Sequence, residues 1–176
     1  MQPKTIKTPF NKDNFLNSQR TIWTFSNKKR IKLYIIFTIW AVLLIFIYRT
    51  PNKNTTDSIG SGIVYGYVFY MILYWVGFYE RKIRFFKKSR TCATRFEKES
   101  MECTFTLNEH ELEYQDLEKT YKLNWSLFNP YIVFKETILL MAKDSGGIIF
   151  TLSRKELGET DYQDVCNILN DKIGRA

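Results

Sequence analysis

Histidine and cysteine, which supply many of the metal ligands, nucleophiles and general bases of proteins, are scarce in this chain. One of its 176 residues is histidine and three are cysteine. His110 stands between two glutamates in a segment polar enough for a hairpin loop, where a solvated side chain is far more common than a base or ligand. Cys92, Cys103 and Cys166 are odd in number and too widely spaced for a metal-binding motif. We therefore expect no metal centre and no structural disulfide.

The other candidates for chemistry have simpler explanations. Gly60-Ser61-Gly62 lies inside an apolar run rather than between a strand and a helix, which argues against a phosphate-binding loop. Among the acidic residues between positions 109 and 118, Glu111 and Glu113 share one face of a predicted strand, which we expect to be solvated. The same acidic group is also a candidate docking surface for a basic partner. We therefore predict a non-enzymatic protein that needs no cofactor.

Acidic residues are nearly absent from the first half of the chain. Residues 1–90 carry 16 Lys/Arg against 3 Asp/Glu, whereas residues 91–176 carry 10 against 15. The net charge of +8 therefore divides into halves of +13 and −5. A basic half that holds the long apolar runs, followed by an acidic half, indicates a membrane anchor joined to a soluble domain.

The two apolar runs of the basic half are candidate membrane spans. Residues 33–48 are uncharged, but at about 1.5 Å per residue they cover roughly 24 Å of a ~30 Å hydrocarbon core. Ile31 lengthens this run, and Lys32 and Arg49 can place their charges at the interface. Residues 58–79 are uncharged over 22 positions and can span with some tilt. A signal peptide is disfavoured, because about thirty polar residues precede the first run and no cleavage site follows it.

The cations around these runs predict their orientation. Four Lys/Arg lie shortly before the first run and six follow the second, whereas the connecting loop, residues 49–57, has two cations and one aspartate. Because cations are retained on the cytoplasmic side, both termini should be cytoplasmic. We therefore predict an N-terminal cytoplasmic segment over residues 1–30 and a two-helix transmembrane hairpin over residues 31–80, joined by a tight turn.

The segment that follows the second run has the strongest functional signal. Residues 81–92 form a predicted basic juxtamembrane linker in which six cations alternate with apolar residues. Cations just cytoplasmic of a span attract anionic headgroups by about 1 kcal/mol each. The other explanation is that the cations only keep this end of the span on the cytoplasmic side. The two explanations are compatible. Nucleic acid is a poor partner, because the acidic half repels it. The predicted lipid-binding residues are Arg81, Lys82, Arg84, Phe85, Phe86, Lys87, Lys88 and Arg90.

Gly62 and Gly66 form a small-xxx-small pair in the second run. Such a pair lets a neighbouring backbone approach closely within a membrane. The partner helix is either the first run or a second copy of the chain. We therefore predict helix packing at these two glycines, with a homo-oligomer as one of its forms.

From about residue 91 the apolar residues recur every second position, as they do in strands with one buried face. Alternation over residues 101–107, 112–114, 121–125 and 148–152 predicts four strands, and denser apolar runs at 131–134 and 138–142 predict two central ones. We expect these six strands to form one meander, with residues 93–99 as a candidate seventh. Trp125 should be buried on a face that it shares with Tyr121 and Leu123.

Two short helices should close the chain. Ser153 stands three residues before Glu156, which is the spacing of a capping box, and Gly158 can end that helix. Thr160 stands three residues before Gln163 and should begin an amphipathic helix that packs on the sheet or plugs its open end. About 85 residues of antiparallel sheet with a final helix predict an α+β, mainly antiparallel β, domain over residues 93–176, either a small split barrel or a pleckstrin-homology-like (PH-like) module.

Three short motifs follow the hairpin and its basic exit. They are Lys122-Leu123-Asn124-Trp125, Ile138-Leu139-Leu140 and Leu152-Ser153-Arg154-Lys155-Glu156-Leu157. With these motifs in this order, the chain resembles the YcxB-like family of bacterial membrane proteins over roughly residues 30–173. The family usually has Pro-Lys where this chain has Ser153-Arg154, and either pair can open a helix. The resemblance implies a cytoplasmic domain related to pleckstrin-homology folds, but no reaction, ligand or site residues.

These observations favour a bacterial inner-membrane protein whose cytoplasmic PH-like module recognises a protein or lipid partner at the membrane. The alternative is an immunity-type protein that neutralises a membrane-acting toxin by direct contact. A neighbouring toxin gene would favour the alternative.

Overall fold

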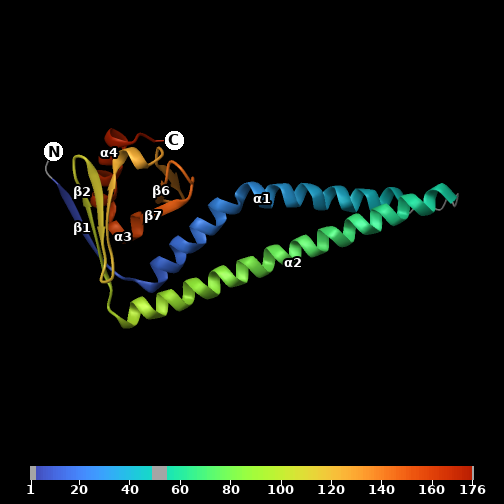
Figure 1. The fold of residues 1–176 in the computed structure, drawn as a ribbon, viewed down its shortest axis with the longest axis horizontal. Coiled ribbons are helices and arrows are strands. Elements are labelled where there is room, and N and C mark those ends of the chain that lie inside the picture. Colours follow the sequence, from blue (N-terminus) through green and yellow to red (C-terminus); the bar gives the residue numbers. More distant parts are fainter. Residues whose placement is uncertain (1–2, 49–54, 176) are drawn as a thin grey trace. The chain divides into compact units, whose positions relative to one another are not determined.

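The computed structural model describes residues 3–48 and 55–175, and the chain folds into two compact units. The sheet unit comprises residues 1–25 and 89–176, and the hairpin unit comprises residues 26–88. Two long helices, α1 (Lys12–Tyr48) and α2 (Thr55–Lys98), each contribute residues to both units (Figure 1). Of the predicted turn over residues 49–57, positions 49–54 lie outside the described residues, and α2 begins at Thr55.

A four-stranded antiparallel sheet has the order β1-β2-β3-β4. Its strands are β1 (Lys4–Pro9), β2 (Glu102–Leu107), β3 (Glu111–Gln115) and β4 (Thr120–Asn124). The first strand comes from the N-terminal segment, and its register with β2 runs from Lys4 opposite Leu107 to Pro9 opposite Glu102. Along the chain, the helical hairpin therefore lies between β1 and β2, two strands that pair with each other in the sheet (Figure 1).

The candidate strand at residues 93–99 is wrong, because α2 continues to Lys98. This stretch contains neither glycine nor proline, and Arg95 pairs with Glu99 one helical turn later. The helix ends at Lys98, and in the turn that follows it Ser100 has a left-handed φ of 46°. Backbone N–H groups of Ser100 and Met101 donate to the carbonyls of Glu97 and Phe96, as in a Schellman motif. Glycine is usual at this left-handed position, so the serine leaves the end of the helix without its usual marker in the sequence.

A second antiparallel sheet contains β5 (Ile132–Phe134), β6 (Thr137–Met141) and β7 (Ile148–Ser153) in that order. All six predicted strands are therefore present. They do not form one meander, because a 3-10 helix, η1 (Trp125–Leu127), separates β4 from β5. Trp125 is buried as predicted, but it lies in η1, and Tyr121 is 43% exposed, so the two do not share a buried face.

The C-terminal helices join the two sheets around one core. The capping box of α3 (Arg154–Leu157) is confirmed, with Ser153 and Glu156 bonding reciprocally, and Gly158 ends the helix at a φ of 77°. Helix α4 (Glu159–Lys172) follows Gly158 directly, so Thr160 is not its cap. Its buried residues join those of both sheets, and the resulting core includes Ile6, Phe105, Leu107, Leu112, Trp125, Phe128, Ile138, Leu140, Leu152, Tyr162, Val165 and Leu169.

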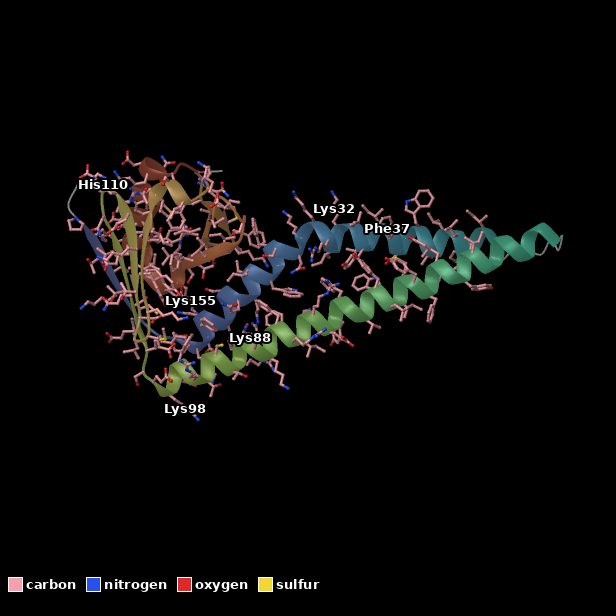
Figure 2. All side chains as sticks on the ribbon, viewed as in Figure 1. Lys32, Phe37, Lys88, Lys98, His110 and Lys155 are labelled. Atoms are coloured by element: carbon pink, nitrogen blue, oxygen red, sulfur yellow. The ribbon has the colours of Figure 1, made fainter. Side chains whose placement is uncertain are left out.

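The hairpin unit holds its two helices together by an aromatic cluster. Tyr34 is 1% exposed and its ring contacts those of Tyr74, Trp75 and Phe78 at centroid distances of 4.6, 5.6 and 5.3 Å. The indole Nε1 of Trp75 also donates to Thr38 Oγ1 at 3.1 Å. Most other apolar side chains of the hairpin project outward (Figure 2). In the most apolar 18-residue stretch of each helix, 11% of α1 and 17% of α2 is buried. Both helices are long and apolar enough to cross a membrane.

Candidate functional site

The basic segment, residues 81–90, is a continuation of the apolar helix. Helix α2 runs through the uncharged stretch and on to Lys98, so the predicted linker is helical in the structure. All six cations of the segment are exposed. Arg81, Arg84 and Lys88 follow the i, i+3, i+7 spacing that places side chains on one helix face. Arg84 contacts Glu80 at 3.4 Å, and the remaining cations keep the segment strongly positive.

The apolar residues of this segment differ in their exposure. Phe85 and Phe86 are half-buried and their rings meet edge to face at 5.3 Å. Ile83 is 51% exposed. The six cations are therefore more exposed to solvent than Phe85 and Phe86 are.

Gly62 and Gly66 are exposed and do not receive the other helix. A Cβ atom added to either glycine would meet no atom within 4 Å among the described residues. Their neighbours Ile63 and Tyr65 are 70% and 69% exposed. Within the described residues, the first run therefore does not pack against this pair of glycines.

The acidic side chains of the sheet unit are partly matched by cations of the same unit. Glu113 stands opposite Lys122 in the β3–β4 register and contacts it at 3.4 Å, and Glu118 pairs with Arg95. Asp116 Oδ1 accepts hydrogen bonds from two backbone N–H groups and closes the turn between the strands. Glu111, Glu113 and Asp116 are half-buried rather than fully solvated, and the contacts of Glu113 and Asp116 lie within the sheet unit.

The three cysteines are free thiols. Cys103 and Cys166 are half-buried against the core, and burial raises the pKa of both thiols above its ordinary value. Both are therefore protonated near neutral pH, which makes them weak nucleophiles. His110 is exposed in the β2–β3 loop (Figure 2). Among residues 3–48 and 55–175, no three His, Cys, Asp or Glu side chains gather closely enough to hold a metal ion.

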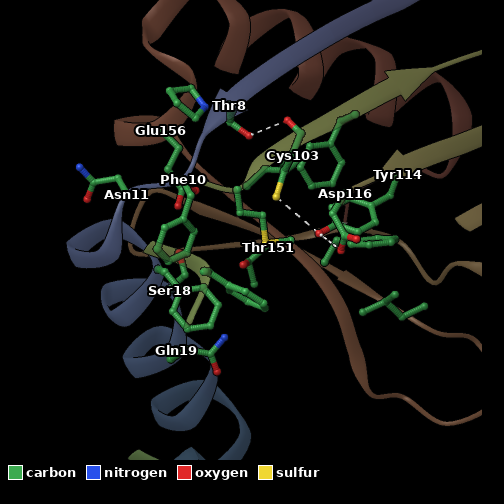
Figure 3. Close-up of a pocket in the computed structure, with 18 of the residues that line it drawn as sticks. Thr8, Phe10, Asn11, Ser18, Gln19, Cys103, Tyr114, Asp116, Thr151 and Glu156 are labelled. Carbon is green, nitrogen blue, oxygen red and sulfur yellow. Dashed lines mark hydrogen bonds between the residues drawn. The ribbon is translucent and has the colours of Figure 1, made fainter. Parts of the chain in front are cut away.

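A cavity of about 360 Å³ lies within the sheet unit between the first turns of α1 and strands β2, β3 and β7 (Figure 3). Two aromatic triads line it. Phe10, Phe15 and Phe96 lie 5.7 to 5.9 Å apart by ring centroid. Phe105, Tyr114 and Phe150 lie 5.0 to 5.8 Å apart. Sequence reasoning missed this site because its walls come from segments up to about 150 residues apart.

Hydrogen bonds hold one polar wall of the cavity. The Tyr114 hydroxyl donates to Asp116 Oδ2 at 2.9 Å and lies 3.5 Å from Cys103 Sγ. Burial, with the neighbouring thiol and carboxylate, raises the pKa of Tyr114 well above its ordinary value, so the phenol stays protonated and remains a donor.

Comparison with known proteins adds no assignment to these sites. No family model, curated protein or solved structure matches the chain. The basic segment, the outward-facing glycines and the cavity are the features of the chain that bear on its function.

Proposed function

We propose that this protein is a non-enzymatic, membrane-anchored binding module whose basic segment binds anionic lipid headgroups. The observation that carries the proposal is the unbroken helix that leads from an apolar run into six exposed cations. A helix that spans a bilayer would bring its first polar turns to headgroup level. Cations at that level are attracted to an anionic leaflet by about 1 kcal/mol each.

Membrane insertion is supported by the apolar surface of the hairpin unit. Ile35, Trp40, Phe46, Ile63 and Phe69 are each at least 50% exposed, and their neighbours are exposed as well. Soluble proteins rarely present contiguous apolar surfaces of this kind to water. Lipid is the environment that solvates them, and the flanking cations favour a bacterial inner membrane with both termini in the cytoplasm.

We propose further that the sheet unit is a PH-like recognition module of the YcxB-like kind. Two antiparallel sheets and one C-terminal amphipathic helix around a shared core support this proposal. Its partner is a lipid or a protein held near the membrane.

Reporter fusions test the topology. Fusions after Gln19 and after Ala176 should both report a cytoplasmic position, whereas a fusion within residues 50–57 should report an external one. A C-terminus on the external side would contradict the cytoplasmic recognition module.

A hairpin-deleted variant tests lipid binding. Because β1 pairs with β2, this variant keeps residues 1–26 and 80–176 and replaces the hairpin with a flexible Gly/Ser linker. It should bind vesicles that contain phosphatidylglycerol, release them as salt shortens the Debye length, and ignore phosphatidylcholine vesicles. Replacing Lys87, Lys88 and Arg90 with Gln should weaken binding by about 3 kcal/mol, roughly a hundredfold.

The matched control removes three cations from elsewhere in the sheet unit. Replacement of Lys119, Lys122 and Lys143 with Gln changes the net charge equally, and should reduce vesicle binding far less. Equal losses in the two variants would show that net charge, and not the basic segment, governs binding. Binding that ignores both salt and the substitutions would mean that the cations serve topology alone.

A further inference from the structure

The aromatic cavity of the sheet unit contains a buried polar atom without a partner. Ser18 lies in α1 on the face that lines the cavity, and its side chain is 4% exposed (Figure 3). Its Oγ has no hydrogen-bond partner in the structure. A buried hydroxyl without a partner is costly, and a ligand group that bonds Ser18 Oγ at this cavity wall would offset that cost. Two neighbouring wall residues do have partners, since Thr8 Oγ1 donates to Cys103 O and Asn11 Oδ1 accepts from Asn14 N–H.

The charge of the cavity walls selects against anions. Asp116 and Glu156 line the cavity and are half-buried, whereas Lys119 is the single basic lining residue and is exposed. Two partly desolvated carboxylates outweigh one solvated ammonium group, because Coulomb interactions strengthen as the local dielectric falls. The six aromatic rings add quadrupoles whose negative faces also attract cations. The carboxylates and the aromatic rings therefore both favour a positively charged ligand.

We propose that this cavity binds a small organic cation with an aromatic or apolar body, whose ammonium group donates a hydrogen bond to Ser18 Oγ. The apolar body stacks between the two aromatic triads. The volume of about 360 Å³ falls within the range of roughly 300 to 1,000 Å³ that is typical of small-molecule sites. This site lies wholly within the sheet unit and does not depend on lipid binding by the basic segment.

Three indole compounds of nearly equal size separate the contribution of charge. Tryptamine carries an ammonium group, indole-3-ethanol is neutral and indole-3-propionate is an anion. The full-length protein would be placed in nanodiscs of phosphatidylcholine, and Cys103 alkylation by N-ethylmaleimide would be followed by mass spectrometry. Cys103 lines the cavity, whereas Cys92 and Cys166 do not, so those two thiols are internal controls. Tryptamine should protect Cys103 alone, at a concentration at least tenfold below that of indole-3-ethanol, and indole-3-propionate should not protect it.

Ser18→Ala tests the hydrogen bond without endangering the fold. Because Ser18 Oγ has no partner in the free protein, its removal should leave the melting temperature unchanged or slightly higher. Protection by tryptamine should become roughly tenfold weaker, as expected for a lost bond to a charged group. Ser26→Ala, an exposed serine of the same helix, is the matched control and should bind as the unaltered protein does.

Asp116→Asn tests the charge term, since the amide oxygen can still accept the two backbone bonds of the turn. The preference for tryptamine over indole-3-ethanol should shrink in this variant. Three outcomes would overturn the proposal. They are equal protection by all three indoles, protection of all three cysteines together, and failure of tryptamine to protect Cys103 at any concentration tested.

Discussion

Apolar residues have opposite environments in the two units of this protein. Ile138, Leu139 and Leu140 of β6 are fully buried, whereas Phe46 and Ile63 of the hairpin are 67% and 70% exposed. The sheet unit therefore supplies its own apolar environment through packing, and the hairpin unit needs one from outside. Substitutions should consequently act through folding in the first unit and through insertion in the second.

The largest effect is expected for Trp125→Ala in the sheet unit. Trp125 is 6% exposed, packs on Phe128 and donates from Nε1 to the Asn108 carbonyl at 3.0 Å. Loss of a buried tryptophan should lower the free energy of unfolding by about 3 to 5 kcal/mol, measured by pulse proteolysis in urea. Leu127→Ala, at a 45% exposed position of the same 3-10 helix, should cost less than about 0.5 kcal/mol. Similar losses for the two variants would contradict the core assignment.

A charge in the middle of the second run should prevent insertion of the hairpin. Phe69 is 62% exposed and lies near the centre of residues 58–79. In water, Asp at such a position would be harmless, but in a bilayer Phe69→Asp should disfavour insertion by about 3 kcal/mol. Glycosylation mapping of the inserted fraction measures this effect, and Phe69→Leu is the control. Equal insertion of the two variants would show that this face does not meet lipid.

Ile6→Ala tests whether the N-terminal strand belongs to the cooperative sheet. Ile6 is 4% exposed and joins the core from β1, although about 95 residues separate it from β2. Its truncation should destabilise the sheet unit by about 2 kcal/mol or more in the same proteolysis assay. Lys7→Ala, on an exposed neighbour in the strand, should have little effect. Equal stabilities would mean that β1 unfolds independently of the core.

Ser100→Gly should stabilise the sheet unit. Ser100 lies in the turn that follows α2 and has a φ of 46°, where a side chain is strained and glycine is not. We expect a gain of about 0.5 to 1 kcal/mol in the free energy of unfolding. Lys98→Gly, two residues earlier and inside the helix, should lose a similar amount. A loss at both positions would place the end of the helix elsewhere.

The smallest effect is expected at the ion pairs between β1 and α4. Lys4 Nζ lies 2.7 Å from Asp161 Oδ1 and 2.9 Å from Asp164 Oδ2, and hydrogen bonds to both carboxylates raise the pKa of Lys4 above 10.5. The stability that this raised pKa represents is present at pH values below 10.5 and is lost as the pH rises through the folded-state pKa. Lys4→Met should therefore lower the melting temperature slightly at pH 7, and the difference from the unaltered protein should disappear in strong alkali. Lys7→Met is the control. If the difference in melting temperature between Lys4→Met and the unaltered protein did not change with pH, protonation of Lys4 would not contribute to stability.

Features encoded by neighbouring residues were predictable from the sequence. The alternation over residues 101–107, the capping box of Ser153 and Glu156, and the uncharged run at 58–79 each depend on contacts or solvation within a few positions. Residues 93–99 show the limit of such reasoning. Their pattern fits a strand as well as a helix end, and the serine at position 100 conceals where the helix stops.

The sequence by itself determined two apolar helices, six strands and a helical C-terminus, because each of these follows from local periodicity. Only the tertiary structure decided that the N-terminal segment is a strand of the sheet, since a single buried residue, Ile6, marks its inner face. It also decided the cavity, where Ser18 from α1 meets Cys103 from β2 and Phe150 from β7. Pairing and packing across such separations depend on the closure of long loops, and no local pattern of residues records which distant segments will meet.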